Sequence, residues 1–92
     1  MAITVKFLSA FQDLTKGKKI FFVDQDRLYK ILDDLERRIP GLKEKFLDKE
    51  GKIHPAYNVI LIRGDIQQLC QDLDCKVEEG DELVIAPIVS GG

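Results

Sequence analysis

The chain has 92 residues, of which 45% are apolar, and carries a formal net charge of −2. This length fits one domain with a modest core, and the charge excludes the strongly basic surface typical of nucleic-acid-binding proteins. No apolar run approaches the roughly 20 residues that cross a bilayer, and residues 1–6 lack the pattern of a signal peptide. We therefore expect a cytoplasmic protein with neither a nucleic-acid nor a membrane partner.

The first part of the chain predicts two strands. Apolar and polar side chains alternate over residues 3–7, which is the period of a half-buried strand. Phe11 and Leu14 indicate a short helical turn, and residues 20–23 are aromatic or β-branched throughout. We expect these two runs to pair as an antiparallel hairpin with a long connection.

One main helix is predicted next, over residues 28–39. Asp24 or Asp26 is the expected N-cap, Pro40-Gly41 should end the helix, and residues 42–47 suggest a shorter helical segment. The apolar face of the main helix follows from side chains at helical spacing, namely Leu28, Ile31, Leu32, Leu35 and Ile39.

The remaining strands are less regular. Residues 58–63 predict a third strand, and because positions 59–62 are all apolar, it should be buried on both faces, in the core or against a partner. Residues 66–75 leave a short strand or a turn open. Residues 83–86 predict the last strand, which Pro87 should end. One main helix covers one sheet face only and leaves the other to solvent or to a partner.

The chain ends in Ser90-Gly91-Gly92. Only a terminal residue carries the α-carboxylate, and two residues without a Cβ give that group a narrow, freely rotating stalk. Fully extended, residues 88–92 reach roughly 17 Å, which is enough to enter a pocket of another protein. The alternative is an inert end, because chain termini are often small and disordered.

Other reactive side chains predict no site. Cys70 and Cys75 match no zinc or redox motif, so we expect two reduced cysteines of small apolar character. His54 precedes a proline and should lie in an exposed loop. No cluster predicts a metal site.

The order of these elements and the tail resemble the MoaD/ThiS family of ubiquitin-like sulfur carriers, and MoaD in particular. Residues 77–92 resemble the family's Gly-Asp-Glu turn, apolar last strand and Gly-Gly tail, and residues 5–14 resemble its first strand. Residues 39–42 also fit. The chain departs from the family at Ile88, where a second proline is usual, and at residues 62–64, where Val-Asn-Gly is frequent.

The resemblance implies an α+β, β-grasp (ubiquitin-like) fold, with a mixed sheet of about four to five strands and one main helix packed on one face. It implies a domain over residues 1–87 and a flexible tail over residues 88–92. An ATP-dependent adenylyltransferase would adenylate the Gly92 carboxylate, and a sulfur donor enzyme would convert it to a thiocarboxylate. The chain itself would bind no cofactor and would not be an enzyme.

The resemblance to MoaD implies the small subunit of molybdopterin synthase, which partners the large subunit in molybdenum cofactor biosynthesis. Three alternatives stay open. They are a modifier joined to lysines through Gly92, a carrier for thiamine, tRNA thiolation, tungsten cofactor or cysteine, and a β-grasp interaction domain with an inert end. The tail residues expected to enter a partner are Pro87, Ile88, Val89, Ser90 and Gly91.

A partner surface is also expected if three side chains on neighbouring strands point away from the helix. If they point toward the helix, they belong to the core. These residues are Phe7, Leu61 and Ile85.

Overall fold

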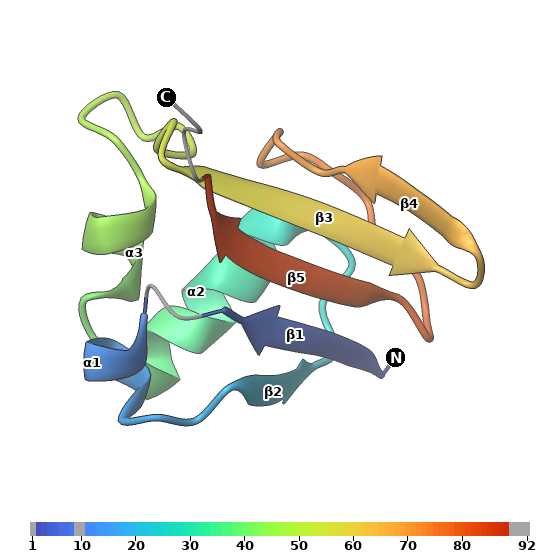
Figure 1. The fold of residues 1–92 in the computed structure, drawn as a ribbon, viewed down its shortest axis with the longest axis horizontal. Helices are drawn as coiled ribbons and strands as arrows, with labels where there is room; N and C mark the ends of the chain where they lie inside the picture. Colours follow the sequence, from blue (N-terminus) through green and yellow to red (C-terminus); the bar gives the residue numbers. More distant parts are fainter. Residues whose placement is uncertain (1, 9–10, 89–92) are drawn as a thin grey trace.

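The computed structural model describes residues 2–8 and 11–88 of the chain. These residues form a five-stranded mixed sheet of order β2-β1-β5-β3-β4, in which β1 and β5 are parallel and the other neighbours are antiparallel (Figure 1). The strands are β1 (Ile3–Phe7), β2 (Ile20–Val23), β3 (Tyr57–Arg63), β4 (Ile66–Leu69) and β5 (Glu82–Pro87).

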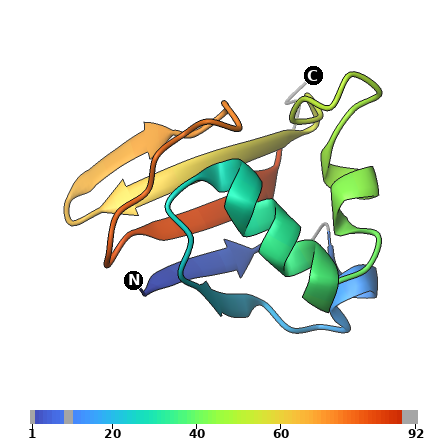
Figure 2. The same ribbon diagram turned by 180° about the vertical axis from the view of Figure 1, so that it is seen from behind.

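Helix α2 (Leu28–Arg38) crosses one face of this sheet, as Figure 2 shows. The short helices α1 (Gln12–Thr15) and α3 (Leu42–Phe46) lie together at one end of the molecule. The predicted hairpin of the first two strands and the single main helix on one face are both confirmed.

The core lies between α2 and the sheet. Alternate residues are buried along β1 and in the middle of β3 and β5, and so are the apolar positions of the helix that the spacing predicts. Removing such side chains from water supplies most of the stabilisation of a domain of this size. Among the largest buried side chains are Ile3, Leu28, Ile31, Leu32, Leu35, Phe11 and Phe46.

The N-terminus of α2 differs from the expectation. Neither Asp24 nor Asp26 caps it; the N-cap residue is Arg27, and its side chain makes no capping bond. Instead, a loop distant in sequence supplies acceptors, because the Leu28 N–H donates to the Cys75 carbonyl (3.0 Å) and the Tyr29 N–H to the Leu73 carbonyl (2.9 Å). Helix-end N–H groups need such acceptors, and here tertiary contacts provide them.

A carboxylate joins the end of α2 to the start of α3. Glu36 accepts hydrogen bonds from the backbone N–H groups of Gly41 (2.9 Å) and Lys43 (2.8 Å). These bonds, that of Lys43 first, lower the pKa of Glu36. Gly41 has φ +95°, and a Cβ there would lie 3.4 Å from Leu14, so the bend suits glycine.

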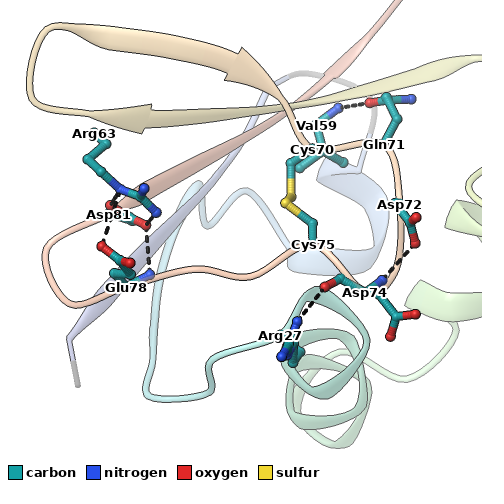
Figure 3. Close-up of a disulfide and its surroundings, with 10 residues drawn as sticks. All are labelled: Arg27, Val59, Arg63, Cys70, Gln71, Asp72, Asp74, Cys75, Glu78 and Asp81. Carbon is teal, nitrogen blue, oxygen red and sulfur yellow. Dashed lines mark hydrogen bonds and ion pairs between the residues drawn. A yellow bond between two sulfur atoms is a disulfide. The ribbon is translucent and has the colours of Figure 1, made fainter.

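The segment after β3 forms strand β4, which pairs with β3 across a turn at residues 64–65. Pairing continues beyond the strand, since the Cys70 N–H donates to the Val59 carbonyl and the Gln71 side chain accepts from the Val59 N–H (Figure 3). The side-chain amide of Gln71 thus accepts a hydrogen bond that the backbone of a longer β4 would otherwise accept.

Cys70 and Cys75 form a disulfide (Figure 3), so the expectation of two reduced cysteines is wrong. Their Cα atoms lie 5.7 Å apart, across the loop whose carbonyls cap α2. This distance is within the range that a disulfide requires. The disulfide therefore closes the loop of residues 70–75, which follows β4 at the edge of the sheet and contacts the start of α2.

An ion pair ties the far end of β3 to the turn before β5. Arg63 donates to both carboxylate oxygens of Asp81, from Nε (2.9 Å) and Nη2 (2.8 Å), and the Glu78 N–H donates to Asp81 as well (2.7 Å; Figure 3). Asp81 is only 2% exposed. The hydrogen bond from Arg63 is the largest cause that lowers the pKa of Asp81.

We expect Asp81→Asn to lower the free energy of unfolding at neutral pH by about 1–3 kcal/mol, because a buried charge-assisted pair is lost. A carboxyl whose folded pKa is lowered contributes stability above its unfolded pKa, and loses it as the pH falls through the folded pKa. The difference between wild type and variant should therefore shrink in acid. Urea unfolding across the acidic range measures it.

Asp65→Asn is the matched control, since Asp65 is exposed in the neighbouring turn. The free energies of unfolding of the wild type and of Asp81→Asn should converge in acid. If their difference stays constant down to strongly acidic pH, this role of the ion pair is contradicted.

Candidate functional site at the tail exit and the open sheet face

The chain leaves the sheet at a fixed point. Pro87 is the last residue of β5 and lies opposite Tyr57, and beyond it the Ile88 N–H donates to the Ala56 carbonyl at 2.7 Å. We call this point the tail exit. Val89, Ser90, Gly91 and Gly92 lie outside the described residues, so their entry into a partner stays a prediction.

Aromatic rings support the tail exit. The Tyr57 ring lies 4.9 Å from that of Phe11 and 6.0 Å from that of Phe46, which are both buried. His54 lies in an exposed loop, as expected, and its Nδ1 accepts the Ala56 N–H at 3.0 Å. The residues on which the last strand ends are therefore held by packing and by local hydrogen bonds.

Phe7, Leu61 and Ile85 do not form a partner surface. They are at most 3% exposed and belong to the core beneath α2. The pattern of positions 59–62 could not reveal this, because Ile60 and Ile62 are as apolar as the residues between and beside them. In the structure, Ile60 and Ile62, which alternate with the buried residues of β3, face away from the helix.

These residues form an apolar surface on the side of the sheet that α2 does not cover, which we call the open face. Its members are half-buried or exposed, and Phe22 and Leu69 are 68% and 64% exposed. Leu8 and Ile88 are also exposed beside it, at the tail exit. Such an apolar surface is typical of a binding interface. The open face consists of Ile20, Phe22, Ile60, Ile62, Leu69, Val84 and Ala86.

Polar side chains share this side of the sheet, since the register places Thr4, Lys6, Asn58, Gln67 and Glu82 in the same phase as the apolar residues. Lys6 of β1 and Glu82 of β5 form an ion pair of 3.1 Å between the strands. Over residues 2–8 and 11–88, no group of three side chains is arranged to hold a metal ion. In the same part of the chain, no helix is long and apolar enough to cross a membrane.

Sequence reasoning missed two features of this region. The pairing of Cys70 with Cys75 had a weak signal, since four intervening residues can form a turn between two cysteines. The bond from Gln71 to β3 had none, because an isolated glutamine carries no pattern.

Known proteins resemble the chain over its full length. The model of the ThiS family matches residues 5–92. The sulfur carrier protein CysO of Mycobacterium tuberculosis is 29% identical over 94 residues, which cover 100% of both chains.

Solved structures agree. A chain in the crystal structure of the Amycolatopsis orientalis BexX/CysO complex has a TM-score of 0.82 and 33% identity, covering 99% of this chain and 100% of that one. SAMP1 from Haloferax volcanii has a TM-score of 0.73 and 25% identity, covering 100% of both.

These matches confirm the β-grasp fold that the sequence suggests. They also include the last two glycines in the matched region, next to a tail exit that the sheet holds in place. The chain therefore belongs to the ThiS family and is related to sulfur carrier proteins.

Proposed function

We propose that the chain carries sulfur as a thiocarboxylate on Gly92, after ATP-dependent adenylation of that residue by a partner enzyme. The family match carries this proposal, because it runs to the terminal glycine pair. The fixed exit at Ile88 supports it, since the remaining residues, 89–92, can extend from a rigid body. Because activation consumes ATP, the proposal also places the protein in the cytoplasm.

The chemistry needs a partner at each step. An α-carboxylate is ionised at neutral pH and unreactive toward sulfur nucleophiles. Its oxygen attacks the α-phosphate of ATP and displaces pyrophosphate, which leaves an acyl-adenylate. Hydrosulfide delivered by the donor then attacks the carbonyl carbon, AMP departs as the leaving group, and loss of the S–H proton leaves the thiocarboxylate. ATP and the catalytic side chains belong to the partners, so the chain acts as a non-catalytic carrier.

The open face is the proposed docking surface for these partners. It lies on one side of the sheet and reaches the tail exit through Val84 and Ala86 of β5. A partner that covers it would bury the second face of β3, whose residues 59–62 are apolar throughout. Ile60 and Leu69 lie opposite each other in the β3–β4 register, and both side chains line the same hollow on this face.

We expect Leu69→Lys, combined with Ile60→Lys, to weaken binding of the adenylating partner about 30-fold or more, as the loss of an interface hot spot does. Ile66→Lys is the matched control, because Ile66 lies on the same strand and is similarly exposed, at 61%. It pairs with Arg63, so it lies on the other side of the sheet from the open face. Titration calorimetry gives the affinities. Equal weakening by both variants would argue against the open face.

Narrower forms of the proposal differ in what reacts with the activated Gly92. The small subunit of molybdopterin synthase would pass its sulfur to the synthase's large subunit, for molybdenum cofactor biosynthesis. The relatives at 29% and 33% identity are CysO proteins, which favours a different acceptor. Conjugation to lysines is the second candidate, supported by the similarity to SAMP1, a small archaeal modifier protein.

Intact-mass spectrometry tests the proposal. The purified chain is incubated with ATP, the adenylating enzyme from the same genome and a sulfur donor, and with the same mixture lacking ATP. Exchange of one oxygen for sulfur at Gly92, only with ATP, is the expected result. Conjugates linked to lysines would favour the modifier instead. An unchanged mass with no conjugates would leave an interaction domain with an inert end.

A further inference from the structure

The charged side chains are distributed unevenly along the strand direction. The tail exit, α1, α3 and the loops beside them lie at one end of the molecule, and the N-terminus and the β3–β4 turn lie at the other (Figures 1 and 2). Residues 8–19 and 36–56, which we call the basic pole, carry nine lysines and arginines against five carboxylates. At the opposite end, residues 24–30, 63–65 and 76–82 carry four against seven.

The dipole of α2 accounts for only part of this separation. The helix dipole favours cations at the C-terminal end of a helix. Arg38 lies in the last turn of α2, but it is also paired with Asp34 at 3.0 Å. Within the described part of the chain, however, no carboxylate lies within ion-pair distance of Lys16, Lys18 or Lys19. These cations need another explanation.

Two carboxylates of the basic pole are already engaged by backbone. Glu36 accepts the N–H groups at the start of α3. Asp48 accepts those of Glu50 (2.8 Å) and Lys52 (3.0 Å), and the hydrogen bond from Lys52 is the largest cause that lowers the pKa of Asp48. Both groups stay ionised to lower pH than usual, yet they face the chain's own backbone rather than the neighbouring lysines of the turn after α1.

Part of the basic pole surrounds a hollow of about 350 Å³ between α1, β2 and the end of α2. Lys16, Lys18 and Arg38 line it, together with Phe21 and Pro40. The Lys18 ammonium lies 4.8 Å from the centre of the Phe21 ring, a cation–π contact that fixes its position. Arg38 also donates to Asp34 (3.0 Å) and to the Phe22 carbonyl (2.9 Å), so Lys16 and Lys18 are the cations of the hollow that remain for a carboxylate side chain.

The backbone holds one of these cations in an unusual conformation. Lys16 has φ +57°, a left-handed conformation that costs a residue with a side chain about 1–2 kcal/mol. Hydrogen bonds from Gly17 N–H to the Gln12 carbonyl and from Lys18 N–H to the Thr15 carbonyl, both 3.1 Å, fix this turn. Lys16 is the C-cap of α1, where a left-handed residue is common, so this conformation fixes where the lysine side chain leaves the turn.

We infer that the basic pole docks on an acidic protein surface that surrounds the pocket for the tail on the adenylating partner, with a partner carboxylate in the hollow of Lys16, Lys18 and Arg38. The inference rests on the proposed function, because it assumes that the tail enters such a pocket. Complementary charge at this end would orient the carrier with its tail forward, and electrostatic steering of this kind raises association rates 10–1,000-fold at low salt.

The test compares two double variants that change the net charge equally. Lys18→Glu/Lys19→Glu reverses charge at the basic pole, and Lys30→Glu/Lys76→Glu does so at the acidic one. ATP–pyrophosphate exchange by the adenylating enzyme gives kcat and KM for the carrier at low and high salt. We expect the first variant to lower kcat/KM about tenfold or more at low salt, through KM, with a flatter salt dependence and unchanged kcat.

Three further results decide the interpretation. Lys18→Arg/Lys19→Arg should keep the wild-type KM, and Lys49→Glu, in another segment of the same pole, should also raise KM. Equal effects of the two double variants, or none, would overturn the inference while wild-type exchange still supports the proposed function. If the adenylating enzyme shows no ATP–pyrophosphate exchange with the wild-type chain, both the inference and the proposed function are contradicted.

Discussion

A chain shortened by one residue, so that it ends at Gly91, is expected to lose adenylation and thiocarboxylate formation by a factor of 100 or more. The reacting carboxylate would retract by about 3.3–3.6 Å, the length of one extended residue. A misplacement of only about 1 Å can cost about 100-fold in rate when a reaction depends on positioning. Gly91→Trp should have a similar effect, because a bulky side chain cannot follow the terminal residue into a narrow channel.

The stability of both variants should match that of the wild type, since over residues 2–8 and 11–88 the hydrophobic core ends at Ile85. Thermal unfolding checks this, and mass spectrometry of the adenylation mixture gives the activity. Ser90→Ala is the control, because it changes the tail but keeps its length and both glycines. Normal adenylation of the shortened chain would show that Gly92 is an inert end.

The second large effect concerns the disulfide. Reduction of the Cys70–Cys75 bond should lower the free energy of unfolding by about 2 kcal/mol, from the chain entropy of a loop this short. For a domain of about 100 residues, this corresponds to a drop of about 8–16 °C in Tm. The loop also caps α2, so the amides of Leu28 and Tyr29 should lose protection from hydrogen exchange first.

Thermal unfolding with and without a dithiol reductant measures this effect. The control is Cys70→Ser/Cys75→Ser, whose Tm the reductant should not change. A wild-type Tm that is the same under both conditions would show that the bond contributes nothing. Because cytoplasmic thiols are usually reduced, the same experiment shows how stable the protein would be in the cytoplasm, the compartment that the proposed function requires.

The main elements could be predicted from local patterns. Alternation over residues 3–7 and helical spacing over residues 28–39 record which face of each element is buried, and the structure follows both. The sequence does not decide between a strand and a turn for β4, because this short, exposed edge strand has two glutamines at its centre and shows no alternation. The cap of α2 could not be foreseen, since its acceptors come from a loop more than 40 residues away.

The sequence predicts a site at the tail, whose last four residues lie outside the described part of the chain, and it could not predict the open face. The terminal glycines are a local signal, whereas the orientation of Phe7, Leu61 and Ile85 depends on how β3 faces the helix. A strand that is apolar at every position gives no phase from its sequence alone. That uniform pattern arises because one side of β3 packs on the core and the other lies on the open face.

The central pairing of the sheet joins the first strand to the last, with Val5 opposite Leu83. During synthesis, β1 therefore has no partner on that side until almost the whole chain has been made, and contacts so distant in sequence form late in folding. A chain interrupted before β5 would lack the middle strand of the sheet. The sheet that holds the tail exit in place is therefore complete only once β5 has been made.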